Sequence, residues 1–304
     1  MAQATMDAGQ APATPEPVTQ PLEKPAFWRT FVSRNKLGTF GIVLLVLILL
    51  LAFIGPFFMS GPNRTQVDKI YAPPSWGHPL GFDYRGRDIW HQIVNGGRSL
   101  ILVATLAAVI STFIAITFGA LAALIGGKTN VAIQTITDVV LTVPVIILLA
   151  VLAAFVKLDS PVLLAVILAA TGWPTLLLAV RAQVLSLRER EYVEAARMLD
   201  LGLPRILFRE VLPNMASYII INFVFAMTGA IYGQVILYFL GLVSLSGDNW
   251  GLMIQEAYRQ GAVFSPDSML GLIAPIFMIV MLLWSLTLVA RSLEDIFNPR
   301  LREL

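Results

Sequence analysis

The amino-acid sequence predicts an all-α integral membrane protein with six transmembrane helices. Hydrophobic residues make up 57% of the 304-residue chain and charged residues only 13%, whereas soluble domains carry about 25% charged residues. The mean hydropathy is +0.77, and several apolar runs approach the length of about 20 residues that spans a bilayer. Because these runs are continuous rather than alternating, they favour helices over a transmembrane barrel.

Six apolar segments are long enough to cross a hydrocarbon core of roughly 30 Å as helices that rise about 1.5 Å per residue. They cover residues 37–59, 100–125, 131–156, 161–180, 217–240 and 270–289. Lys and Arg are more frequent in the loops on the N-terminal side, so both termini are expected in the cytoplasm. The net charge of only +2 indicates no general affinity for nucleic acids.

Several parts of the chain lie outside these segments. Residues 1–26 are rich in Ala, Pro, Gln and Thr and predict a disordered cytoplasmic tail. Residues 60–98 and 242–268 are expected on the outer side. In the first of them, residues 88–94 predict a short amphipathic helix at the membrane interface that ends at Gly96-Gly97. The resulting division is a tail (1–26), a first helix with its outer loop (27–99) and a five-helix core (100–304).

The most informative interruption of the apolar pattern runs over residues 188–214. Helix formers fill residues 191–199, and Gly202 and Pro204 follow them. A second short helix is expected over residues 205–211, so the loop predicts a helix–turn–helix beneath the membrane.

The side chains of this loop suit a docking surface for a soluble partner. Ala195 and Ala196 remove bulk from the first helix, so that another backbone can approach closely. Glu194 and the flanking arginines offer charge-assisted hydrogen bonds. An ordinary charged connector is the alternative, but a loop of about 30 residues with helical periodicity is usually more than a connector.

Polar residues inside the apolar segments are candidates for a transport pathway. Asp138 lies near the cytoplasmic end of the third segment, where it lines the pathway or pairs with a loop arginine. Asn222 and Gln234, 12 residues apart on the fifth segment, are about 40° from eclipsed on a helix. They share a face toward the pathway or form hydrogen bonds between helices. Kinks are expected at Pro144, Pro174 and Pro275.

No enzyme site or metal site is predicted. Gly127-Lys128-Thr129 lacks the first glycine of a phosphate-binding loop, because Ala122 occupies that position. The chain has no cysteine, and its two histidines, His78 and His91, are too few and too far apart for a metal site.

Several motifs resemble those of one family. Tyr192 to Arg197, followed by Leu212-Pro213-Asn214, resembles the EAA loop of ABC importer permeases. The outer loop is similar to that of the second permease of dipeptide, oligopeptide and nickel importers. In the first outer loop, this similarity is carried by His78 to Asp83, Gly86 to Asp88 and Gly96 to Arg98. Asp138 with Pro144 on the third segment, Trp250 to Met253 in the last outer loop and Asn298 to Arg300 at the end also fit the family. The resemblance covers roughly residues 30–302.

This resemblance implies a type I ABC importer permease fold, with the EAA loop as a cytoplasmic coupling helix. The chain would bind no cofactor, since ATP and Mg belong to two separate ABC ATPase subunits. Its other partners would be a second homologous permease, an extracytoplasmic substrate-binding protein and membrane lipid. ATP-driven motion of the coupling helix would switch a central cavity between two sides of a prokaryotic cytoplasmic membrane. Dipeptides or oligopeptides are the expected substrates, with nickel or oligosaccharides as alternatives.

The resemblance also assigns residues to these surfaces. The residues expected to contact the ATPase are Tyr192, Glu194, Ala195, Ala196, Arg197, Gly202, Leu212 and Pro213. The outer loops would face the binding protein through Asp83, Arg87, Asp88 and Trp250. Asp200 stands where the family usually has glycine, so we expect Gly202 to take over the turn, and Gln92 replaces a common arginine. An ion-gradient-driven transporter and a membrane scaffold are the alternative functions.

Overall fold

The computed structural model describes residues 35–59, 61, 63–245 and 247–297. The predicted tail and the motif Asn298 to Arg300 lie outside these residues. The described chain is helical, with isolated bridges but no sheet. Its elements are α2 (Lys36–Phe53), α3 (Gly55–Phe58), η1 (Val67–Lys69), α4 (Ile89–Ile125), α5 (Gly127–Thr142), α6 (Val145–Phe155), α7 (Pro161–Leu187), α8 (Glu191–Met198), α9 (Leu203–Arg205), η2 (Ile206–Val211), η3 (Pro213–Met215), α10 (Ala216–Phe239), α11 (Trp250–Arg259), η4 (Ala262–Phe264), η5 (Pro266–Ser268) and α12 (Met269–Phe297).

The helices confirm the predicted membrane architecture. Five helical runs in the described chain are long and apolar enough to cross a membrane, and the bent pair of α5 and α6 makes a sixth if it forms one span. α2, α4, α7, α10 and α12 each cover most of one predicted segment. Pro174 and Pro275 lie inside α7 and α12, which continue through them.

The third predicted span is not one continuous helix. α5 and α6 meet at an angle of 90° across Val143 and Pro144. Val143 has extended backbone angles of φ −88° and ψ 126°, as expected for a residue that precedes proline. Pro144 therefore separates two helices, where one span over residues 131–156 with a kink at Pro144 was predicted.

The second predicted span begins earlier than expected, because α4 is a single helix of 37 residues. The Asp88 side chain accepts hydrogen bonds from the Trp90 and His91 amides and so caps its N-terminus. The prediction that a separate interfacial helix ends at Gly96-Gly97 is therefore wrong. Ile89 and Ile93, expected at the interface, are buried. The division predicted between residues 99 and 100 falls inside this helix.

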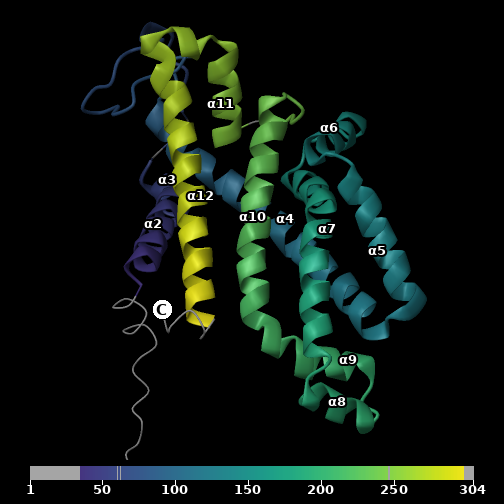
Figure 1. The fold of residues 1–304 in the computed structure, drawn as a ribbon. Coiled ribbons are helices and arrows are strands. Elements are labelled where there is room, and N and C mark those ends of the chain that lie inside the picture. The colour runs from purple at the N-terminus through teal and green to yellow at the C-terminus, as the bar shows by residue number, and fades with distance from the viewer. Residues whose placement is uncertain (1–34, 60, 62, 246, 298–304) are drawn as a thin grey trace, which may run out of the picture.

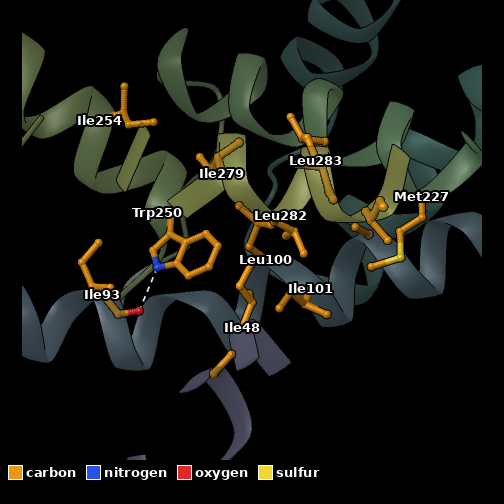
Figure 2. Close-up of a cluster of buried hydrophobic side chains, with 14 of the residues drawn as sticks. Ile48, Ile93, Leu100, Ile101, Met227, Trp250, Ile254, Ile279, Leu282 and Leu283 are labelled. Carbon is orange, nitrogen blue, oxygen red and sulfur yellow. Dashed lines mark hydrogen bonds between the residues drawn. The ribbon is translucent and has the colours of Figure 1, made fainter. Parts of the chain in front are cut away.

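The glycines that were expected to end the short helix instead allow α11 to pack against α4. A Cβ added to Gly97 would lie 2.6 Å from a ring carbon of Trp250, which is too close for an ordinary contact. The Trp250 ring is fully buried, and its Nε1–H donates to the carbonyl of Ile93 at 2.8 Å (Figure 2). The surrounding apolar cluster joins α2, α4, α10, α11 and α12.

The helices form an elongated bundle with two distinct ends (Figure 1). The start of α2, the end of α12 and the helices α8 and α9 lie at one end, which is at the bottom of the view. The loop that precedes α4, the helix α11 and the start of α7 lie toward the opposite end. The end with α8 and α9 is called the lower end and the other the upper end.

Candidate functional site

The lower end carries a compact segment built from α8, α9 and η2, residues 191–211. It is called the α8–η2 segment. Val193 and Ala196 of α8 are buried. They belong to one apolar cluster with Val180 and Val184 of α7 and with Val211 of η2. The predicted helix–turn–helix is therefore present, and its first helix is fixed to the end of a membrane span.

The outer face of α8 combines charge, a small residue and exposed apolar area. Tyr192, Glu194, Ala195 and Arg197 are exposed, and Met198 is 79% exposed. The adjoining Leu199 is 73% exposed, and contiguous apolar area that stays exposed often indicates an interaction surface. Arg205 and Arg209 add positive charge nearby on α9 and η2.

The two alanines of the motif do not share one face. Ala195 is exposed, whereas Ala196 is buried within the chain's own core. Replacing Ala196 would therefore disturb internal packing, and only Ala195 is available to a second molecule. Of the other predicted docking residues, Leu212 is partly buried, while Gly202 and Pro213 are exposed.

The turn after α8 is made by Asp200. Its φ is 52°, in the left-handed region, whereas Gly202 has a φ of −57°. The Leu201 amide donates to the carbonyl of Ala196 at 3.2 Å, which closes the end of the helix. The expectation that Gly202 takes over the turn is wrong, because aspartate tolerates the left-handed conformation.

Two arginines tie the lower end of α7 to neighbouring helices. The Arg188 Nη1 donates to the carbonyl of Ala123 at the end of α4, at 2.9 Å. The Arg181 Nε donates to the Asn130 Oδ1 of α5 at 2.7 Å. These hydrogen bonds link the lower end of α7 to both α4 and α5.

A cavity of about 350 Å³ lies between α4, α6, α7 and α10. Its wall is mostly apolar, and its polar groups come chiefly from Ser111, Thr171, Thr175, Asn222 and Tyr232. The Asn222 Nδ2 donates to the carbonyl of Tyr218, one turn earlier in α10. No Asp, Glu, Lys or Arg is among the described residues that line this cavity.

The predicted pathway residues have different locations. Asn222 lines the cavity, but Gln234 does not, so the two do not share a face toward it. Gln234 is 0% exposed, and neither its Nε2 nor its Oε1 has a hydrogen-bond partner among the described residues. Asp138 is exposed on α5 and forms no ion pair within the described chain.

At the upper end, charged residues join the loop before α4 to α11. The Arg87 guanidinium contacts the Asp83 Oδ2 at 2.8 Å and the Glu256 Oε2 at 2.6 Å. Burial alone would lower the pKa of Arg87, but these two carboxylates outweigh it and raise the pKa. Arg85 forms a second contact with Glu256 at 3.2 Å. Arg87 is therefore a partly buried link between the two segments.

These contacts revise the predicted outer surface. Asp83 accepts hydrogen bonds from the Arg85 and Arg87 amides and from the Gln92 side chain. The Asp88 Oδ2 contacts the His78 Nδ1 at 2.7 Å while its Oδ1 caps α4. The prediction that Trp250 faces a partner is wrong for this conformation, because its side chain is 0% exposed.

Glu256 was missed because residues 242–268 were treated as a loop. The spacing of Trp250, Met253, Ile254 and Ala257 follows the i, i+3, i+4, i+7 rule and would have predicted the amphipathic α11. Cavity residues such as Thr171 and Tyr232 carried no comparable signal, because single polar residues in a span do not reveal which face is inward. Among the described residues, no group of three or more His, Asp or Glu could hold a metal ion.

Comparisons with known proteins match this architecture. Residues 115–303 match the family described as binding-protein-dependent transport system inner membrane component. Residues 26–74 match the N-terminal TM domain of oligopeptide transport permease C. A putative peptide permease protein of Brucella ovis is 34% identical over 271 residues, 88% of each chain.

Two relatives in Bacillus subtilis have more specific names. The oligopeptide transport system permease protein OppC is 30% identical over 292 residues, 91% of each chain. The dipeptide transport system permease protein DppC is 29% identical over 281 residues, 90% of this chain and 85% of that one. The chain therefore belongs to the family of binding-protein-dependent transport system inner membrane components, the permease subunits of ABC transporters.

Proposed function

We propose that this permease subunit imports dipeptides or oligopeptides across a prokaryotic cytoplasmic membrane by alternating access. The names of its relatives support peptides as the cargo. The uncharged cavity wall also suits a chemically varied cargo better than a bare metal ion, which needs anionic or imidazole ligands.

The observation that carries the proposal is the α8–η2 segment, with an exposed outer face and an inner face packed on α7. We place this segment in the cytoplasm, in a cleft of an ABC ATPase subunit. Tyr192, Glu194, Ala195 and Arg197 would contact the ATPase directly. The buried Val193 would pass the movement to α7 through the cluster at the lower end.

The complete transporter in this proposal contains a second homologous permease, two ATPases and an extracytoplasmic binding protein. ATP and Mg bind the ATPases, and this chain holds no cofactor. Closure of the ATPase pair favours one arrangement of the spans and ADP release the other, so the cavity opens alternately to each side. Since α4, α6, α7 and α10 all line the cavity, motion of α7 against α10 would change its shape.

The first experiment is a charge reversal in the docking face. We expect Glu194→Lys to leave the subunit inserted, because the side chain is exposed, but to reduce co-purification of the ATPases at least tenfold. Asp267→Lys is the matched control, since Asp267 is also exposed but lies on η5, near the upper end. Full ATPase recovery and normal ATP-dependent peptide uptake with Glu194→Lys would contradict the docking role.

Uptake assays in membrane vesicles test the driving force and the cargo. Peptide uptake should stop when ATP is depleted while the ion gradient is kept. Persistent uptake would favour an ion-gradient-driven transporter. ATP-dependent uptake of nickel or an oligosaccharide, with none of peptides, would retain the mechanism but reject peptides as the substrate.

A further inference from the structure

We propose that a groove between α4 and the start of α7 binds an anionic phospholipid. The groove has a volume of about 680 Å³ and shares no lining residue with the cavity between α4, α6, α7 and α10. Its walls are apolar along most of their length, and Arg98 lies at one end. The proposal depends on membrane insertion and on the upper and lower ends of the bundle, but not on the identity of the cargo.

The floor of the groove is a continuous apolar stripe on α4. Leu102, Leu106 and Val109 follow one another at i, i+4 and i+7, so they share one helix face. All three remain substantially exposed. Val162, at the start of α7, forms part of the opposite wall and is also exposed. An acyl chain is the ligand whose chemistry matches such a surface within a membrane.

Arg98 lies one helical turn before Leu102 and therefore extends the same face. Its side chain is exposed and forms no ion pair within the described chain. The neighbouring polar groups already have partners, because Asn95 donates to His91 and Ser99 accepts a hydrogen bond from Asn249. The Arg98 guanidinium is thus a charged group in the lining of the groove that remains available to bind a ligand. Its planar donors match the oxygens of a phosphate.

The length of the groove fits one leaflet of a bilayer. Arg98 and Val109 are separated by 11 residues, or about 16 Å along a helix. One leaflet contributes about half of a hydrocarbon core of roughly 30 Å. Arg98 also lies two residues before the apolar segment predicted to start at Leu100, which places its charge at headgroup depth. A phosphate at Arg98 and an acyl chain along Leu102, Leu106 and Val109 would therefore fit together.

Charge favours a lipid over a helix of another subunit. A protein helix seated in the groove would need a carboxylate of its own opposite Arg98 to supply a counter-ion. An anionic lipid already carries its phosphate at that depth. Because its headgroup has a net negative charge, it should bind better than a zwitterionic lipid.

The test uses the whole transporter complex in nanodiscs. One set contains phosphatidylcholine alone and the other contains phosphatidylcholine with phosphatidylglycerol. Native mass spectrometry counts the retained lipid, and thermal unfolding gives the midpoint. The wild-type complex should retain phosphatidylglycerol and unfold several degrees higher in its presence. Arg98→Gln should reduce retention at least fivefold and abolish the shift, whereas Arg98→Lys should keep part of both.

Two further variants separate the parts of the site. Leu106→Trp would fill the apolar groove while keeping the charge, and it should also lose the retained lipid. Arg64→Gln is the matched control, because Arg64 is an exposed arginine of the upper loop that does not line the groove. It should behave like the wild type.

The proposal is overturned if Arg98→Gln retains phosphatidylglycerol as the wild type does, or if Leu106→Trp has no effect. It is also overturned if single-cysteine Leu106→Cys cross-links efficiently to the second permease, because a protein helix would then occupy the groove. None of these readouts requires transport, so they remain informative if the proposed cargo is wrong.

Discussion

The side-chain amide of Gln234, in the C-terminal half of α10, is buried and has no hydrogen-bond partner within the described chain. Leaving a buried polar group unsatisfied costs about 1–3 kcal/mol, and both amide atoms of Gln234 lack hydrogen bonds in the described chain. We predict that Gln234→Leu and Gln234→Met stabilise this conformation by about 1 kcal/mol or more. Thermal unfolding of the purified complex measures this effect. A lower unfolding midpoint in both variants would mean that the amide is hydrogen-bonded after all.

Asp248, in the loop before α11, gives a prediction that depends on pH. Burial raises the pKa of its carboxyl above 3.8, while His91 and Arg87 oppose the shift and Asp83 and Glu256 add to it. The folded protein therefore binds the proton more tightly than the unfolded chain. Stability is lost as the pH rises from about 3.8 through the raised pKa.

Asp248→Asn removes this loss because an amide does not ionise. We expect the variant to be more stable than the wild type at neutral pH, and the difference to shrink as the pH falls toward 3.8. Unfolding midpoints measured between pH 4 and pH 8 test the trend. A difference that grows at low pH would contradict the assigned cause, which is burial of the carboxylate.

At the scale of single elements, the turn after α8 depends on the left-handed Asp200. Glycine adopts this conformation freely, whereas a β-branched residue is strained there by roughly 1–2 kcal/mol. Hydrogen exchange of the α8 amides should therefore slow in Asp200→Gly and accelerate in Asp200→Val. Equal exchange in the two variants would show that the turn does not control the stability of the helix.

The elements also show which parts of the fold can be predicted from sequence. Hydropathy predicted the membrane segments, because an exposed backbone in lipid has few alternatives to a helix. Local residues did not predict that α4 continues through Gly96-Gly97, since the packing of Trp250 on Gly97 joins residues that are distant in the chain. The bend at Pro144 was expected as a kink, but its angle of 90° depends on tertiary packing.

At the scale of the whole molecule, the candidate site was predictable only in part. The position and helical character of the α8–η2 segment could be predicted, because charge and helix formers set it apart from the spans. Three features could not be predicted, because each depends on how distant helices pack. They are the burial of Ala196, the wall of the cavity and the contact between Arg87 and Glu256. The fold defines the upper and lower ends, whereas the distribution of Lys and Arg in the loops predicts which end faces the cytoplasm.

Thiol labelling can locate the α8–η2 segment relative to the membrane, because the chain has no native cysteine. Ala195→Cys places one thiol on the exposed face of α8, and Trp76→Cys places one on the exposed upper loop. A membrane-impermeant thiol reagent is then applied to right-side-out and to inverted membrane vesicles that lack the ATPases. We predict labelling of Ala195→Cys only in inverted vesicles, labelling of Trp76→Cys only in right-side-out vesicles, and protection of Ala195→Cys when the ATPases are added. Labelling of Ala195→Cys from the outside would contradict the account, because no ATPase could reach the α8–η2 segment there.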